Sequence, residues 1–431
     1  MSTYLRKCLD LAPTPLTRPV PPSEPPIPND YRTVRVQSWW SAMRATTSHL
    51  RILADWPSIQ NSPDPPGTLI QDGWALEALD RQIEAAHEDG LKIILLPYRY
   101  PSWVNDTANI ASGLPNFDFY PWDRFARLAL YQTAVSGGML NQKALTYRMP
   151  PDGFGPESRW ARYVGWLIDR YGAKIAAIEV VNEPNLQLWP QRTQPDPDIA
   201  FAQKWDTADS RLVVTEQVAQ MMITVDALSR AHGDSWTLLA PSCSDSETVT
   251  QRRYQTIVHP NPTLTETFTG ALLTALEGLG FVADDRWVWA YHNYTDFERD
   301  RRHVVDVRAL LESGGWKGRR LDGGPELWGT EGGVRLNVMG TRFNTTDVGE
   351  RKALQAKVMA EGLARHHYAK GAGAGIGMFT QYTTFADPGF DDGLLDSVIA
   401  GGVARPALAV WSGMPEYVSS PVQRAAWRPQ P

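Results

Sequence analysis

The stretch 74–98, WALEALDRQIEAAHEDGLKIILLPY, decides the fold, because an amphipathic helix is followed there at once by an apolar run. The predicted helix ends at Gly90, a residue type that commonly terminates helices. The run KIILLPY at 92–98 is apolar at consecutive positions, as is typical of a parallel strand covered on both faces. The apolar face of the helix, repeated at helical spacing, comprises Leu76, Leu79, Ile83 and Ala86.

The same alternation of β-like runs and helical stretches continues along the chain after Asp30, and it predicts parallel strands joined by crossover helices. We favour a (β/α)8 TIM barrel over an open doubly wound sheet, because no G-x-G-x-x-G or Walker loop follows an early strand. The length of 431 residues is ordinary for such a barrel with insertions. The predicted strands are 33–39, 49–56, 92–98, 175–184, 236–242, 287–294, 326–333 and 375–383.

Two segments do not follow this alternation of strands and helices. Residues 1–30 are crowded with proline between 12 and 30 and are predicted to form an extended N-terminal segment, either a tail or an arm on the barrel. Residues 31–431 are then the catalytic barrel. The stretch 104–150 is a long insertion after the third predicted strand, and insertions of this kind commonly shape a substrate cleft.

The composition sets limits on function. Hydrophobic residues make up 42% and charged residues 21%, as in soluble globular proteins. A net charge of −6 argues against partners such as nucleic acid or an anionic membrane, since both need a basic face. We found no apolar run long enough for a signal peptide or a membrane span, so a cytoplasmic location is expected. The two cysteines, Cys8 and Cys243, are expected to be inert thiols rather than a disulfide framework.

Tryptophan is unusually frequent, with 17 Trp beside 15 Tyr and 12 Phe. Flat aromatic faces suit the apolar face of a sugar ring, although large rings also fill the core of a large protein. Trp103 follows a predicted strand directly and is the best candidate for a sugar-stacking wall, and Trp189 lies in the loop after the fourth strand. The alternative interpretation of each of these tryptophans is that it packs in the core.

Two glutamates stand at strand ends, where barrel enzymes place their catalytic groups. Glu183 ends the run IAAIEVVNEP, and Glu331 ends the run ELWGTE. A carboxyl group in an apolar run is costly unless it has partners or a task. Glycoside hydrolysis needs two carboxyl groups that face the same bond, so the pair predicts a glycosidase. Glu179 is expected on the same side of its strand as Glu183 but deeper, as a buried partner rather than a catalytic group.

At these residues the chain resembles the clan A glycoside hydrolases, the group of cellulase-like and β-xylosidase-like (β/α)8 enzymes. The resemblance covers about residues 31–411. Asn182-Glu183-Pro184 matches the strand-four motif of that clan, which implies that Glu183 is the acid/base and that Asn182 holds the sugar 2-hydroxyl group. It further implies that Glu331 is the nucleophile of a retaining mechanism.

The resemblance extends to the supporting residues. His292-Asn293-Tyr294 is similar to the His-x-Tyr of strand six, whose Tyr bonds to the nucleophile, and Arg51 is similar to the arginine beside the nucleophile. Clan members often carry a Trp at the end of strand eight, which this chain lacks. Phe379 or Tyr382 would then be the platform under the sugar. Arg51 as a core ion pair and His292 as a structural histidine stay open as alternatives.

The physical roles make further demands. The acid/base must hold its proton near neutral pH, so Glu183 is expected to have a raised pKa from an apolar setting. The nucleophile must stay ionised, and Arg51 and Tyr294 would stabilise the charge of Glu331.

The leading function is therefore a retaining hydrolase of β-linked gluco- or xylo-configured glycosides, acting on small glycosides or oligosaccharides without a cofactor. A transglycosylase would use the same two glutamates. A non-catalytic carbohydrate-binding barrel would be expected to have lost one of them, and a metal-dependent barrel would need clustered His and Asp at strand ends, which we did not find, so no metal is predicted.

Overall fold

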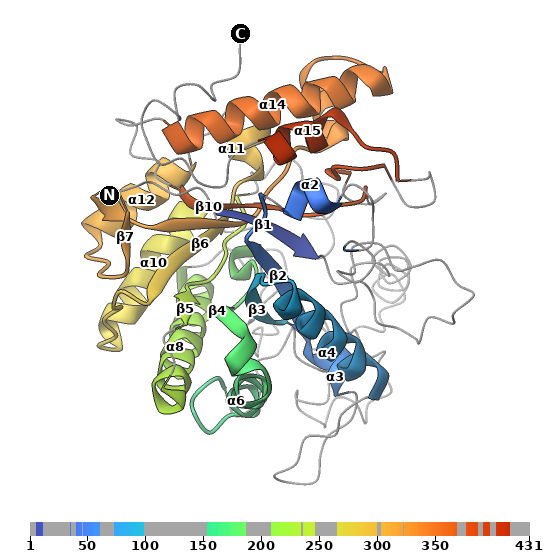
Figure 1. Cartoon of the computed structure of the whole chain (residues 1–431). Coiled ribbons are helices and arrows are strands. Elements are labelled where there is room, and N and C mark those ends of the chain that lie inside the picture. The colour runs from blue at the N-terminus through green and yellow to red at the C-terminus, as the bar shows by residue number, and fades with distance from the viewer. Residues whose placement is uncertain are drawn as a thin grey trace, which may run out of the picture.

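The computed structural model describes residues 6–11, 35, 40–44, 46–60, 73–98, 153–186, 208–233, 236–245, 265–299, 303–321, 323–368, 376–386, 391–396 and 402–413. Within these ranges, parallel strands close into an eight-stranded barrel in the order β1-β10-β9-β6-β5-β4-β3-β2 (Figure 1). The predicted (β/α)8 fold is confirmed. The barrel strands are β1 (Arg6–Leu11), β2 (His49–Asp55), β3 (Lys92–Tyr98), β4 (Ile175–Glu179), β5 (Thr237–Leu239), β6 (Trp287–His292), β9 (Leu327–Glu331) and β10 (Ile376–Gln381).

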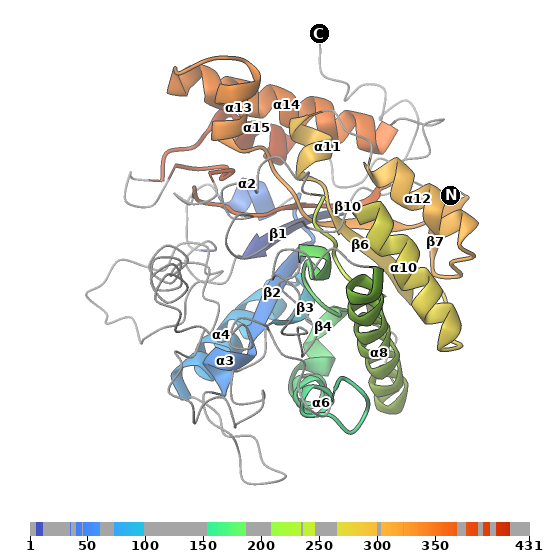
Figure 2. The same cartoon turned by 180° about the vertical axis from the view of Figure 1, so that it is seen from behind.

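Helices lie around the outside of the strands, as Figures 1 and 2 show from opposite sides. A two-stranded antiparallel sheet of β7 (Arg320–Leu321) and β8 (Gly324–Pro325) precedes β9. No described helix is both long and apolar enough to cross a bilayer. The helices are α2 (Trp40–Arg44), α3 (Trp56–Ile59), α4 (Gly73–Glu88), α6 (Arg159–Tyr171), α8 (Ala208–His232), α10 (Thr265–Gly278), α11 (Tyr294–Glu298), α12 (His303–Ser313), α13 (Leu336–Arg342), α14 (Val348–Tyr368) and α15 (Pro406–Gly413), with the 3-10 turns η5 (Gly172–Lys174) and η6 (Pro184–Leu186).

The first barrel strand differs from the prediction. Apart from Arg35, the range 33–39 lies outside the described residues. The place between β2 and β10, which was expected for 33–39, is taken by β1, which pairs in parallel with both. This run, RKCLDL, belongs to the segment 1–30 that was predicted as an extension, so part of that segment is a barrel strand. Residues 12–30 and the insertion 104–150 lie outside the described residues.

The core has two layers, because successive side chains of a strand point to opposite faces. Between strands and helices, Tyr163 of α6 stacks on Trp56 at 4.6 Å and donates a hydrogen bond to the carbonyl oxygen of Ala54. The helix α6 begins after Ser158, whose hydroxyl group caps it by accepting from the amide of Ala161. The smaller inner layer fills the barrel itself with Cys8, Ile94, Ala177, Leu239, Val288, Ala290, Trp328 and Met378.

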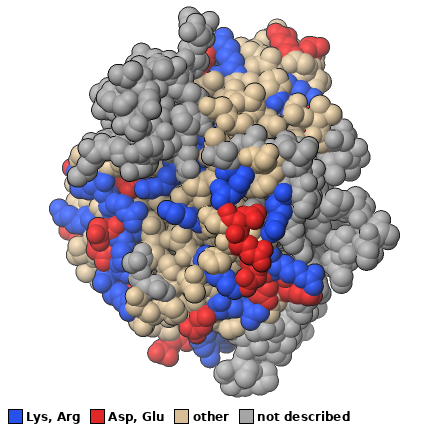
Figure 3. Space-filling model, in the orientation of Figure 1, with Lys and Arg blue, Asp and Glu red and all other residues tan. Residues whose placement is uncertain are grey.

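Both cysteines, Cys8 and Cys243, are buried and free, as expected for inert thiols. On the outer surface, basic and acidic side chains are interspersed on the face that Figure 3 shows. Among the described residues, surface ion pairs join Arg170 with Asp80 and Arg230 with Asp284.

Candidate active site

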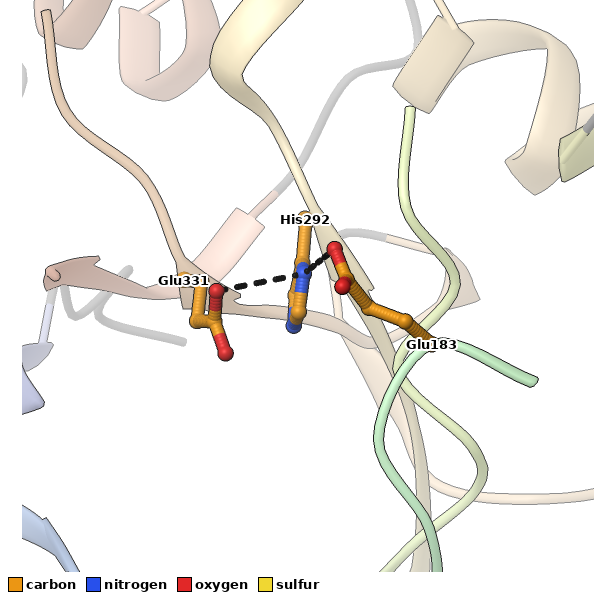
Figure 4. Close-up of side chains that lie close together, drawn as sticks. All are labelled: Glu183, His292 and Glu331. Carbon is orange, nitrogen blue, oxygen red and sulfur yellow. Dashed lines mark hydrogen bonds and ion pairs between the residues drawn. The ribbon is translucent and has the colours of Figure 1, made fainter. Parts of the chain in front are cut away.

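Two carboxyl groups meet at one imidazole where the strands end. Glu331 is the last residue of β9, His292 is the last residue of β6, and Glu183 follows β4. Figure 4 shows the His292 ring between the two glutamates: its Nδ1 atom lies 2.9 Å from Oε1 of Glu183 and 3.5 Å from Oε2 of Glu331. An oxygen of each carboxyl group lies within 4.8 Å of the other. Two carboxyl groups and one imidazole, from three different strand ends, therefore converge on one point.

Glu183 has a left-handed backbone conformation, with φ of 45°, which residues with a side chain rarely adopt. Its amide donates to the carbonyl oxygen of Ser242 at 2.8 Å, and the preceding residue Asn182 forms a β-bridge with the same serine. Asn185 then exchanges two hydrogen bonds with the backbone of Ser244. These contacts hold the strained residue in place, and such strain concentrates at functional sites.

Glu331 is positioned by close backbone packing. It is paired in register with His292, and its carbonyl oxygen accepts from the amide of Asn293 at 3.2 Å. Glycine follows it twice: a Cβ atom at Gly332 would lie 2.1 Å from Oδ1 of Asn293, and one at Gly333 would lie 2.3 Å from Oδ2 of Asp392. Only glycine lets the chain turn away here without pushing the glutamate out of place.

Arg51 of β2 is fully buried and lies beside the nucleophile candidate, as predicted. Its Nη1 atom donates to Oε1 of Glu331 at 2.7 Å. The Nε and Nη2 atoms donate to the two carboxylate oxygens of Glu179 at 2.6 and 2.8 Å, and Nη2 also donates to Oδ1 of Asn182 at 2.7 Å. Glu179 thus has the buried partner role that its strand position suggested, and one guanidinium group organises both glutamate-bearing strands.

Asp10 of β1 also accepts a hydrogen bond from Nη1 of Arg51. Asp10 was not among the predicted site residues, because the polar run RKCLDL was not predicted as a strand. The signal available was its alternation, which places Cys8 and Asp10 on one face and Lys7 and Leu9 on the other. Ser242, whose hydroxyl group donates to Glu179, and Ser244, which hydrogen-bonds Glu183, were missed for a similar reason, since serine has no distinctive pattern at strand ends.

The protonation pattern differs from the expectation for Glu183. Burial raises the pKa of its carboxyl group, but the hydrogen bond from His292 and the charge of that ring outweigh burial, so the pKa lies below its usual value. Burial lowers the pKa of His292, but the neighbouring Glu331 and Glu183 charges raise it above its usual value. Burial raises the pKa of Glu331, which Glu183 raises further, against the opposing effects of His292 and Arg51. The expected raised pKa of Glu183 is therefore wrong, because the hydrogen bond and the charge of His292 outweigh burial.

Two tyrosines border Glu331. The hydroxyl group of Tyr294 donates to Oε2 of Glu331 at 3.4 Å, and the Tyr294 ring meets the half-buried Tyr382 edge to face at 6.2 Å between centroids. Burial and then the charge of Glu331 raise the pKa of Tyr382 well above its ordinary value. The Tyr382 amide donates to the carbonyl oxygen of Gly332, the residue after Glu331, at 2.8 Å.

Phe379 is not available as a sugar platform. It lies on the outer face of β10, where it stacks on Phe297 at 4.9 Å and packs against Trp411 at 5.6 Å. The strand alternates, so the preceding Met378 points into the barrel and Phe379 points toward the helices. Tyr382 is the remaining candidate, while Trp103 and Trp189 lie outside the described residues.

Glu183, His292 and Glu331 are also the side chains of the described ranges whose donor atoms converge closely enough for a metal ion. A divalent ion at this point would have to displace the proton of His292 and share Glu331 with the guanidinium group 2.7 Å away. Like charges oppose that arrangement. The three side chains therefore fit proton transfer better than metal binding.

Comparison with models of known protein families gives no match, and comparison with curated proteins gives none either. Among solved structures, the chain is similar to xylanase B from Clostridium stercorarium F9, with a TM-score of 0.50 and 13% identity over 95% of this chain and 97% of that one. A family 39 glycoside hydrolase from the gut symbiont Bacteroides cellulosilyticus WH2 has a TM-score of 0.49 and 14% identity over 98% of this chain and 64% of that one. A GH5-4 broad specificity endoglucanase from Clostridium acetobutylicum has a TM-score of 0.47 and 13% identity over 95% and 96%.

The chain thus spans less than two thirds of the family 39 structure. At 13% identity, the similarity to the xylanase B structure shows the barrel fold alone, and a barrel hosts many unrelated reactions. The function has to be argued from the chemistry of the site.

Proposed function

We propose that this protein is a retaining glycoside hydrolase that cleaves β-linked glycosides, with Glu331 as nucleophile and Glu183 as acid/base. The observation that carries the proposal is the approach of the two carboxyl groups to within 4.8 Å. Retaining enzymes have a separation of about 5–5.5 Å, whereas inverting enzymes need roughly 6.5–9.5 Å to admit a water molecule. The close approach of the two carboxyl groups supports the retaining mechanism over the inverting one.

The first step uses both groups on one bond. Glu331 attacks the anomeric carbon while the glycosidic oxygen takes a proton from Glu183, so the C–O bond breaks and a covalent glycosyl-enzyme forms. In the second step Glu183 takes a proton from water, the water oxygen attacks the same carbon, and the bond to Glu331 breaks. Arg51 and Tyr294 stabilise the charge that Glu331 carries before the first step and regains after the second.

His292 completes the proton path. Its Nδ1 atom lies 2.9 Å from Glu183, so a single proton is shared between imidazole and carboxyl group and titrates as a property of the pair. The lowered pKa of Glu183 and the raised pKa of His292 favour the nitrogen as the proton's position in the ligand-free site. In the first step this single proton passes from His292 through Glu183 to the glycosidic oxygen, which leaves Glu183 ionised as the base of the second step. This arrangement meets the need for an acid near neutral pH although the pKa of Glu183 itself is lowered.

Sugar recognition follows from Asn182. Its amide oxygen accepts from Arg51, so its NH2 group remains to donate, in keeping with a bond to the sugar 2-hydroxyl group that strengthens in the transition state. Tyr382 supplies an aromatic face beside Glu331. We propose gluco- or xylo-configured β-glycosides of small size as substrates, with water as the acceptor of the glycosyl group.

The test is a panel of aryl β-glycosides of both sugar types, followed by proton NMR of the first anomer released. Double displacement predicts that the β-anomer appears first and the α-anomer only by mutarotation. First appearance of the α-anomer would contradict retention. A lack of turnover of every glycoside by a folded protein would contradict the glycosidase proposal.

A further inference from the structure

We propose that Asp10 is a positioning residue of this site: as a neutral carboxylic acid it holds Nη1 of Arg51 in place and leaves the guanidinium charge to Glu331. The effect of Asp10 on catalysis rests on the proposed function, but the protonation state of Asp10 can be measured independently of it. Nη1 of Arg51 donates to both Asp10 and Glu331. Among the described residues, no third side chain of the site accepts a hydrogen bond from this nitrogen.

The geometry begins with the strand register. Asp10 of β1 is the direct partner of Arg51 on β2, so their side chains leave the sheet side by side. Both side chains have no exposed surface. Nη1 of Arg51 therefore bridges Asp10 and Glu331, and any movement of Asp10 changes the contact that Glu331 receives.

The charges around Arg51 do not balance. Its Nε and Nη2 atoms are taken by the two oxygens of Glu179, while Nη1 faces both Asp10 and Glu331. One positive charge would thus face three buried carboxylates if all were ionised. Burying a carboxylate without a full partner is costly, and the group then takes up a proton instead.

Asp10 is the carboxyl group with the least support. Its Oδ1 atom is buried and has no hydrogen-bond partner among the described residues, whereas both oxygens of Glu179 are bonded. Burial raises the pKa of Asp10 well above its ordinary value, and the charges of Glu331 and Glu179 add to this against the lowering by Arg51. The other titratable groups that face this cluster are Cys8, Glu183, His292, Tyr294 and Tyr382.

The neutral state has a consequence for catalysis. With Asp10 protonated, Glu331 is the only anion on Nη1, so it stays ionised and oriented for attack. When Asp10 ionises at alkaline pH, it competes with Glu331 for the guanidinium group and repels the charge of the nucleophile. Asparagine at this position keeps the acceptor oxygen and the neutral charge, whereas alanine removes both.

The protonation state is measured directly by carbon NMR of protein labelled at the aspartate side-chain carboxyl carbon. The resonance missing from Asp10→Asn identifies Asp10. We expect it at the position of a neutral carboxyl group at pH 7, with titration only at alkaline pH. A carboxylate position at pH 7 would overturn the proposal, whether or not the protein hydrolyses glycosides.

The activity arm compares Asp10→Asn and Asp10→Ala with a matched control, Glu326→Gln. Glu326 is a buried carboxyl group that pairs with Arg6 and starts the run leading to β9, away from the Arg51 cluster. We expect kcat of Asp10→Asn within about threefold of the parent, and kcat of Asp10→Ala roughly ten- to hundredfold lower with little change in KM, since a buried donor loses its acceptor.

Equal loss in Asp10→Asn and Asp10→Ala would overturn the neutral state, and full activity of Asp10→Ala would overturn the positioning role. If Asp10→Ala does not fold, Asp10→Asn and the NMR resonance still decide. Activity loss in Glu326→Gln of the same size as in Asp10→Ala would assign the effect to barrel stability and also overturn the role. The NMR result stands even if no glycoside is cleaved, so failure of the proposed function is recognised separately.

Discussion

The carboxyl groups of Glu183 and Glu331 lie on either side of the His292 imidazole and within 4.8 Å of each other. They come from strand ends that are far apart in the sequence, and the parallel barrel brings them to one edge. The strained backbone of Glu183 and the two glycines after Glu331 keep this approach. The relation between these two residues is the basis of the predictions below.

Replacing Glu331, the proposed nucleophile, should abolish activity on every substrate. In Glu331→Ala no carboxylate remains to form the glycosyl-enzyme, so kcat/KM should fall by roughly 10⁴-fold or more, the scale seen when an enzyme loses its nucleophile. The measurement is steady-state hydrolysis of the aryl glycoside panel with Glu326→Gln as the control for a lost buried carboxylate. Residual turnover near the parent rate would remove Glu331 from this role.

Replacing Glu183, the proposed acid/base, should slow the cleavage of substrates with poor leaving groups most. In Glu183→Ala, dinitrophenyl glycosides need no proton and should form the glycosyl-enzyme at a nearly normal rate, whereas unactivated glycosides should lose about 10²–10⁴-fold, the usual contribution of general acid catalysis. Azide should rescue turnover, because the space left by the carboxyl group admits a small nucleophile. Equal losses for all leaving groups, unaffected by azide, would speak against the assignment.

The alkaline side of the pH profile should depend on His292. Its pKa is raised above the ordinary value of 6.5, so the pair of His292 and Glu183 keeps its proton until the pH rises above that value. Activity should be present below this pH and fall as the pH increases through it. In His292→Gln the proton is held by Glu183 alone, and the alkaline limb of kcat/KM should move to lower pH. An unchanged limb would show that the imidazole does not share the proton.

Arg51 should contribute far more to the free energy of unfolding than a surface arginine does. In Arg51→Met the carboxyl groups of the cluster lose their buried partner, and the free energy of unfolding should fall by about 3–5 kcal/mol. The control is Arg170→Met, since Arg170 pairs with Asp80 at the surface and should contribute less than about 1 kcal/mol. Urea unfolding followed by circular dichroism measures both. Similar losses in the two variants would contradict the organising role of Arg51.

A second histidine links stability to pH. The hydrogen bond to Glu266 raises the pKa of His303 from 6.5 to about 9, so its contribution is fully present below pH 6.5 and is lost as the pH rises to about 9. The unfolding free energy should therefore decline over this interval. In Glu266→Gln the decline should be much smaller, because the pKa of His303 returns toward its ordinary value. The comparison needs urea curves at several pH values, and parallel declines in both proteins would refute it.

The sequence predicted most of the barrel for a physical reason. Seven of the predicted strand ranges overlap the observed ones, because those strands are covered on both faces and read as apolar runs. The first strand was missed since three of its six residues, Arg6, Lys7 and Asp10, are charged and are matched only by partners in three dimensions. Lys7 reaches Trp411 near the other end of the chain, and no local pattern reports such a contact.

The site shows the same division. The positions of the strand ends and the residue types were sufficient to predict a common site for five residues: Arg51, Glu183, His292, Tyr294 and Glu331. Phe379 was misplaced because the aromatic residue type was given more weight than the alternation of the strand. The location of the shared proton could not be predicted, since it depends on the 2.9 Å contact between His292 and Glu183 and on the number of carboxyl groups around Arg51.

The most direct test of the account is to trap the intermediate. A 2-deoxy-2-fluoro glycoside with a dinitrophenyl leaving group, in gluco and xylo forms, should inactivate the protein by forming a stable ester. Peptide mass spectrometry should place one adduct per chain on Glu331 and none on Glu183. An adduct on Glu183 instead, or rapid turnover of natural glycosides with no adduct on either glutamate, would contradict the double-displacement account.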